Sequence, residues 1–309
     1  MMRFVITKLL RAVATLFLCI TICFFVLRLS GDPVDLMFSD EVPETVKAEY
    51  REKLGLNRPL EEQYSRFVLT VFRGDFGTSL VDGRNAMDVV LERVPATALL
   101  GSAVVFIALL IGVPAGIFAA LRHGKTADRL VMSSAVFGYA MPNFFLGILL
   151  ILLFALRLRW LPSSGYGTAA HLVLPAITLG AAMAGKLARF VRTSVLEVLG
   201  NPFIRAVNGM RLPPQRVMFR HIFPNAAIPV ITFLGFEFGL LIGGAVVTES
   251  VFGWPGVGRL LALSVARRDL AVVEAIIFLI ALTMITTNLL VDLAYGWFDP
   301  RIRKNSDPR

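Results

Sequence analysis

Residues 189–229 read RFVRTSVLEVLGNPFIRAVNGMRLPPQRVMFRHIFPNAAIP, a basic segment between two long apolar runs. Asn201 can cap a helix and Pro202 suits its first position, because the amide hydrogen at that position would have no partner anyway. Leu212-Pro213-Pro214 ends it, because proline disfavours helical geometry in the residue before it. The sequence therefore predicts a helix from about Pro202 to Arg211, too short to be stable alone in water. Such a helix at the cytoplasmic face of a membrane protein is suited to docking on a partner.

The composition places the chain in a membrane. Hydrophobic residues make up 56% and charged residues 17% of the chain, and the mean hydropathy is +0.71, outside the usual range for soluble domains. A large soluble protein with buried helices is the alternative, but too little polar sequence remains to cover its core. About 20 residues cross the hydrocarbon core. We therefore predict an all-α integral membrane protein with six transmembrane helices, in Leu9–Leu29, Thr97–Leu121, Leu130–Leu156, a weaker Leu172–Ala188, Ala226–Val247 and Val272–Val291.

The first apolar run is predicted to remain in the protein. It has the basic start of a secretory signal, but no small-x-small cleavage site follows and the run continues to Leu29. We predict one membrane domain over residues 1–309. It comprises a first helix (1–30), an extracytoplasmic segment (31–95), a core of five helices (96–298) and a cytoplasmic tail (299–309).

The distribution of charge predicts the orientation. With the N-terminus inside, more than half of the basic residues fall in the cytoplasmic pieces, whereas residues 28–93 carry a net negative charge. This agrees with the positive-inside rule and predicts that both termini are cytoplasmic. The net charge of +9 then reflects topology, and nucleic-acid binding is not needed to explain it.

The segment after the first helix has the pattern of an ordered structure. Pro43–Leu54 contains helix-forming residues and a turn follows at Gly55. Leu60–Arg73 has apolar residues at helical spacing, which predicts a helix lying along a surface. The alternative is a disordered loop.

Glycines within the predicted spans indicate close helix packing. Gly235, Gly239 and Gly243 fall on one face of the fifth predicted stretch, and Gly112 and Gly116 repeat this spacing in the second. Small residues four apart let helices approach closely in lipid.

Two features inside the spans are candidates for the translocation path. Pro114 and Pro142 are expected to kink or loosen their helices, and Asn143 beside Pro142 either lines the path or belongs to a packing kink. Glu237 is a carboxylate in the middle of an apolar span, where charge is costly. It therefore faces water, the path, or a hydrogen-bonding partner on an adjacent helix, and we predict that it points away from the glycine face.

The sequence gives no sign of catalysis. It has no GxxxxGK[ST] phosphate loop, so we expect no ATP hydrolysis by this chain alone. The three histidines lack metal-ligand spacing, and Cys19 and Cys23 are interpreted as small apolar residues of the first span. We predict that this chain is not an enzyme and holds neither a metal nor a cofactor.

A series of short motifs runs in order along nearly the whole chain. Together they resemble the inner-membrane permease subunits of binding-protein-dependent ABC importers, in the dipeptide, oligopeptide and nickel branch. The motifs are Gly31-Asp32-Pro33, LGLNRPLEEQY from Leu54, GDFGTSL from Gly74, VPAT from Val94, MPNFFLG from Met141, WLPSSGYG from Trp160, LPAITLG from Leu174, RHIFPNAAIPVIT from Arg220, GGAVVTESVFGWPGVGRLL from Gly243 and DPRIR from Asp299.

The resemblance assigns a role to the short helix. The family's cytoplasmic EAA loop, whose helix docks into a groove on the ATPase, falls here on Arg205-Ala206-Val207. Arg211 stands where the family has a glycine, and Gly209 supplies part of the missing freedom. The ATPase-coupling residues that this implies are Asn201, Pro202, Phe203, Arg205, Ala206, Val207, Gly209 and Arg211.

The resemblance also implies partners and a mechanism. A second, related permease subunit would enclose the path with this one, and two cytoplasmic subunits would bind ATP and Mg. An extracytoplasmic binding protein would deliver the ligand, and the location would be a bacterial inner membrane. Closure of the ATPases would drive the spans between inward-open and outward-open states. Di- or oligopeptides are the expected ligands, with nickel or glutathione as alternatives. A secondary transporter working without an ATPase is the alternative from another class.

Overall fold

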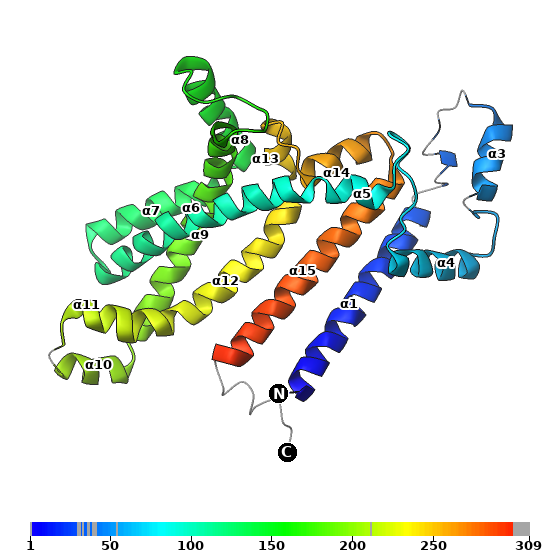
Figure 1. The fold of residues 1–309 in the computed structure, drawn as a ribbon. Coiled ribbons are helices and arrows are strands. Elements are labelled where there is room, and N and C mark those ends of the chain that lie inside the picture. Colours follow the sequence, from blue (N-terminus) through cyan, green and yellow to red (C-terminus); the bar gives the residue numbers. More distant parts are fainter. Residues whose placement is uncertain are drawn as a thin grey trace.

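The computed structural model describes residues 2–29, 32, 34–35, 38, 42–53, 55–210 and 212–298. The described part is helical, with one isolated β-bridge between Thr78 and Asn85. Figure 1 shows one set of long helices that run in a similar direction and a second set that lies at an angle to the first. The elements are α1 (Met2–Leu29), α3 (Glu44–Lys53), α4 (Leu60–Arg73), α5 (Ala86–Leu91), α6 (Val94–Leu121), α7 (Thr126–Ala140), α8 (Asn143–Leu150), η1 (Ile151–Arg157), α9 (Ala169–Leu199), α10 (Pro202–Gly209), α11 (Pro214–Val217), η2 (Met218–Ile222), α12 (Phe223–Gly244), α13 (Val246–Val251), α14 (Val257–Ala266) and α15 (Leu270–Phe298).

The long helices confirm the prediction of an all-α membrane protein. Within the described residues, four helical runs are long and apolar enough to cross a membrane: Ile6–Val26, Ala86–Leu121, Ala169–Leu199 and Leu270–Val291. Two bent pairs bring the total to as many as six, if each pair is one span. The pairs are Thr126–Ala140 with Asn143–Arg157, bent by 97°, and Gln215–Ala227 with Pro229–Glu237, bent by 45°.

The third predicted span is sharply broken rather than straight. α7 ends at Ala140 and α8 begins at Asn143, with Met141 in an extended conformation between them (φ −74°, ψ 128°). Pro142 causes the break, because proline has no amide hydrogen and pushes the preceding residue out of helical geometry. No break occurs at Pro114, since α6 runs through it to Leu121.

α6 and α9 approach each other closely through glycines, as predicted for the second span. A Cβ atom at Gly112 would lie 2.8 Å from the carbonyl oxygen of Ala184, and one at Gly116 would lie 2.5 Å from that of Ala188. Both distances are shorter than side chains tolerate, so only glycine permits this contact. Gly185 gives α9 a similarly close approach to the backbone of α7. The three helices α6, α7 and α9 therefore form one tightly packed group.

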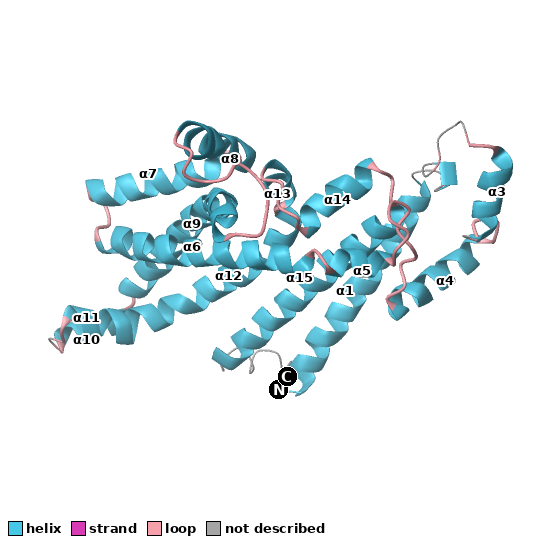
Figure 2. Cartoon of the chain, turned by 45° about the horizontal axis from the view of Figure 1, so that its top comes forward, coloured by secondary structure: helices cyan, strands magenta, loops and turns pink. Residues whose placement is uncertain are grey.

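A second group is formed by α12, α15 and α1. Gly235 faces Val291 of α15, at a distance that leaves no room for a larger residue. Gly235 thus lies at a close helix contact, whereas the surroundings of Gly239 and Gly243 lie outside the described part, so packing along the whole glycine face stays a prediction. α1 lies along α15, and the two helices run side by side in both views (Figures 1 and 2).

The segment between α1 and α6 is ordered where the structure describes it. α3 and α4 match the two predicted helices, and Gly55 and Gly74 both have positive φ angles where those helices give way to turns. α4 lies across one end of α1 (Figure 1), with Tyr64 and Thr21 hydroxyls 2.8 Å apart. Farther along, the Ser79 hydroxyl donates to Asp269 at 2.5 Å, which ties the segment to the start of α15.

Candidate functional site

The short helix α10 has one face in the core and one in solvent. It begins at Pro202 as predicted and ends at Gly209, two residues before the predicted end; Arg211 lies outside the described residues. Ile204 and Val207 are buried in the main apolar core. Phe203 and Ala206 on α10, and Met210 directly after it, are apolar and exposed. Asn201, Pro202 and Gly209 are also exposed, and the side chain of Arg205 lies outside the described part.

α10 is joined directly to α9 by Gly200 and Asn201. The fourth predicted span, Leu172–Ala188, ended near Ala188, and the basic segment from Arg189 was expected to be a loop that follows it. That expectation was wrong, because α9 continues to Leu199 and carries Lys186, Arg189 and Arg192. The sequence has no helix breaker before Gly200-Asn201-Pro202, so the helix extends to that point. A displacement of α10 is therefore passed to a long helix rather than to a flexible loop.

An ion pair with a buried carboxylate joins α9 to the first turn of α7. Arg192 donates from Nε and Nη2 to the two carboxylate oxygens of Asp128, at 2.7 Å each. The Gly124 amide also donates to Asp128, at 3.0 Å, and Asp128 is 3% exposed. This bidentate pairing offsets the free-energy cost of burying the Asp128 carboxylate. His123 lies at the edge of the pair, with Nδ1 2.9 Å from Arg192.

Glu237 forms an ion pair with α9. The ammonium of Lys186 lies 3.1 Å and 3.3 Å from the two carboxylate oxygens of Glu237. The Glu237 side chain is 13% exposed, whereas that of Lys186 is 43% exposed. Glu237 points toward α9 and Gly235 toward α15, as predicted from their spacing. Lys186 is therefore the partner of Glu237 on an adjacent helix. That Glu237 also lines the translocation path stays a prediction.

Asn143, the other candidate for the path, is the first residue of α8 and is half-buried beside the break at Pro142. It lies on a different helix from Glu237. The described contacts do not join the two residues, so they do not form one site.

At the opposite end of the molecule from α10, a buried carboxylate organises the turn between α13 and α14. Glu249 is fully buried and accepts hydrogen bonds from the Thr97 hydroxyl at 2.8 Å and the Arg259 amide at 2.9 Å. Thr97 in turn accepts from the Val257 amide at 2.8 Å. Burial raises the pKa of the Glu249 carboxyl above its ordinary value, and its hydrogen bonds offset part of that rise. This network fixes α13 and α14 to the start of α6.

The loop between η1 and α9 packs on the same turn. Trp254 is buried, and its indole N–H donates to the Ala96 carbonyl at 2.9 Å. The Tyr166 ring stands edge-on against Trp254, with centroids 4.9 Å apart. The Gly165 amide donates to the Phe252 carbonyl at 2.9 Å. The motifs WLPSSGYG and VFGWPGVG, far apart in sequence, thus meet in one cluster.

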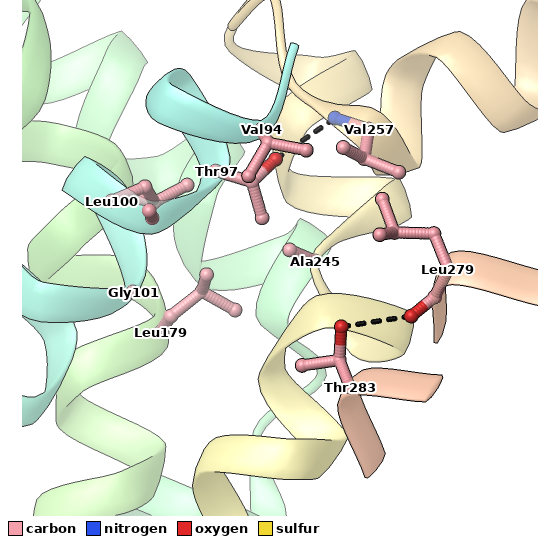
Figure 3. Close-up of a pocket in the computed structure, with 10 residues that line it drawn as sticks. Val94, Thr97, Leu100, Gly101, Leu179, Ala245, Val257, Leu279 and Thr283 are labelled. Atoms are coloured by element: carbon pink, nitrogen blue, oxygen red, sulfur yellow. Dashed lines mark hydrogen bonds between the residues drawn. The ribbon is translucent and has the colours of Figure 1, made fainter. Parts of the chain in front are cut away.

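An apolar cavity of about 190 Å³ lies between the two helix groups (Figure 3). The described residues that line it are apolar apart from two threonines. Its lining residues are Val94, Thr97, Ala98, Leu100, Gly101, Leu179, Ala245, Val257, Leu279 and Thr283.

Comparison with known proteins identifies this architecture. Residues 112–304 match the family described as the binding-protein-dependent transport system inner membrane component, and residues 1–101 match its N-terminal family. The chain belongs to this permease family.

Named relatives align with almost the full length of this permease. It is 40% identical to the glutathione transport system permease protein GsiC of Escherichia coli K12 over 304 residues, 98% of this chain and 99% of that protein. GsiC of Salmonella paratyphi A is similar to the same extent. A structure of the MetNI methionine ABC transporter, described as inward facing, matches with a TM-score of 0.54 at 20% identity, over 66% of this chain and 95% of that one. This last likeness confirms the fold.

The family assignment defines the type of function. The protein is a non-catalytic membrane subunit of an ABC importer, and it works with ATPase subunits and a solute-binding protein. Sequence reasoning missed the partners of its buried charges: Asp128 with Arg192, Glu237 with Lys186, and Glu249 with Thr97. Of these residues, only Glu237 could be recognised from the sequence as needing a partner, because it lies within an apolar run.

Proposed function

We propose that this permease imports short peptides, with glutathione as the first ligand to test. The proposal rests on 40% identity to the glutathione permease GsiC along 98% of the chain. A second, related permease subunit completes the path, two ATPase subunits carry ATP and Mg, and both termini of this chain are cytoplasmic in a bacterial inner membrane.

Uptake measurements test the ligand. Cells with the complete transporter, and cells lacking this chain, are given radiolabelled glutathione or a radiolabelled dipeptide. Uptake that depends on this chain, and is lost with an ATPase partner unable to hydrolyse ATP, is the expected result. Dependence for nickel but for neither peptide would overturn the proposal.

We propose α10 as the helix that docks on the ATPase. The supporting observation is its exposed apolar face at Phe203, Ala206 and Met210, directly joined to α9. Ala206 is the smallest side chain on this face, so it permits the closest approach of a partner.

An A206E variant tests the docking helix. We expect it to insert and assemble normally but to lose roughly tenfold or more of its ligand-stimulated ATP turnover, because a carboxylate is buried without a partner at the interface. A169E is the matched control, since Ala169 is an exposed alanine at the other end of α9. Normal turnover in A206E would place the docking surface elsewhere.

A further inference from the structure

Lys186 occupies a position where a charge is costly. α9 has 31 residues, and at about 1.5 Å per residue Lys186 lies roughly 25 Å from its start and about 20 Å from its end. At about 46 Å, α9 is longer than the hydrocarbon core of about 30 Å, and Lys186 lies in the cytoplasmic half of the predicted span Leu172–Ala188. A half-exposed ammonium at this depth faces water or another protein surface, since charged residues inside spans rarely face lipid.

Glu237 neutralises this region only in part. Arg189 follows one turn after Lys186 and is exposed on a neighbouring part of the same helix. Its guanidinium donates to the Tyr139 hydroxyl at 3.1 Å and lies over the Tyr139 ring, and this partner is uncharged. Among the described residues only Lys186 pairs with this carboxylate, so Lys186, Arg189 and Glu237 together carry one net positive charge. The next cation, Arg192, is already paired with Asp128.

We propose that Lys186 and Arg189 form an anion site on the translocation path that takes the carboxylate of a passing ligand. The inference rests on the proposed function, since peptides and glutathione carry free carboxylates. Glu237 holds the ammonium in place through one side and leaves the other side open. An ammonium has three N–H donors and can donate to several partners at once, which suits a site that must also release its ligand.

The local potential can be measured without transport. Ala182 is half-buried one turn before Lys186 and on the same face, so a cysteine there reports on the ammonium. In the complete complex, with Cys19 and Cys23 replaced by serine, A182C is reacted with anionic and cationic methanethiosulfonates. We expect the anionic reagent to be favoured relative to a free thiol.

Removal of the Lys186 charge should reduce this preference. K186M alone would leave Glu237 without its partner, so the comparison is between E237Q and E237Q with K186M. The added K186M should lower the anionic-to-cationic rate ratio about tenfold, as expected for one charge at about 6 Å in a watery site. K125M, which removes a lysine from the exposed turn after α6, should leave the ratio unchanged. A cysteine unreactive to both reagents, with and without vanadate-trapped nucleotide, would overturn the proposal. An anionic-to-cationic rate ratio that K186M leaves unchanged would also overturn the proposal. A carboxylate of the second permease subunit that neutralises Lys186 would give this result.

Transport provides the second readout. On the E237Q background, K186M should lower the maximal rate of glutathione uptake about tenfold, and K186R should retain it. Equal uptake rates in E237Q and in E237Q with K186M would show that the Lys186 ammonium does not bind the ligand during transport. If the wild-type complex carries neither glutathione nor dipeptides, the proposed function fails, while the labelling ratio still decides the potential.

Discussion

Glu249 shows how one buried residue can organise a junction of several helices. Its carboxylate is fully buried, but each oxygen has a donor: the Thr97 hydroxyl on one side and the Arg259 amide on the other. A carboxylate removed from water is tolerated only when its hydrogen bonds are replaced within the protein. The three residues come from α6, α13 and α14, so the junction depends on this single acceptor.

We predict that E249A destabilises the protein by roughly 3 kcal/mol or more, because it leaves several buried donors without an acceptor. The measurement is the thermal unfolding of the complete complex in detergent. E197A is the control, since Glu197 is an exposed carboxylate on α9 and its loss should have almost no effect. A similar melting temperature for E249A and E197A would mean that water replaces the carboxylate.

Residue pairs of this kind could not be predicted from one sequence. Asp128 and Arg192 are 64 positions apart, and both belong to charged, locally unremarkable stretches. Glu237 was noticed because it interrupts an apolar run, yet its partner Lys186 lies 51 positions away. Local patterns carry no information about which helices will be neighbours.

At the scale of elements, local signals were more informative. Pro142 predicted the break between α7 and α8, and Pro202 predicted the start of α10. The size of the bend, 97°, and the extension of α9 to Leu199 depend on tertiary packing and were not predicted. The spacing of Gly112 and Gly116 predicted close packing but not that α9 would be the partner.

The contact between α6 and α9 leads to a further prediction. G116A should destabilise the complex by about 1–3 kcal/mol, because the new methyl group would meet the backbone oxygen of Ala188, which cannot move away alone. G101A on the same helix is the control, as nothing lies within 4 Å of a Cβ there. Thermal unfolding in detergent distinguishes them. Equal stability would show that α6 and α9 separate at little cost.

At the scale of the whole molecule, α9 connects the functional parts. It is joined to α10 at one end, packs against α6 and α7 along its length, and reaches α12 through the pair of Lys186 with Glu237. Force on α10 therefore acts on the α6, α7 and α9 group as one body. The cavity beside Thr97 and Leu279 lies between α6 and α15 (Figure 3), and this gap in the packing leaves room for these two helices to shift, whereas α12 packs directly against α9.

Such transmission works only if α10 lies on the side of the ATPases. Figure 1 shows α10 at the same end as the start of α1 and the end of α15, with α3 and α4 toward the other end. The basic residues predict that the first of these ends is cytoplasmic.

Cysteine labelling in intact cells tests this orientation. In a background without Cys19 and Cys23, an impermeant thiol reagent added outside should label E61C and should leave A206C unlabelled, although both positions are exposed in this chain. Because the docked ATPase could itself shield A206C, the same variant is also treated in opened cells stripped of the ATPase, where it should label. Labelling of A206C from outside would contradict the predicted orientation. The positive charge would then be concentrated on the extracytoplasmic side, and α10 could not reach an ATPase.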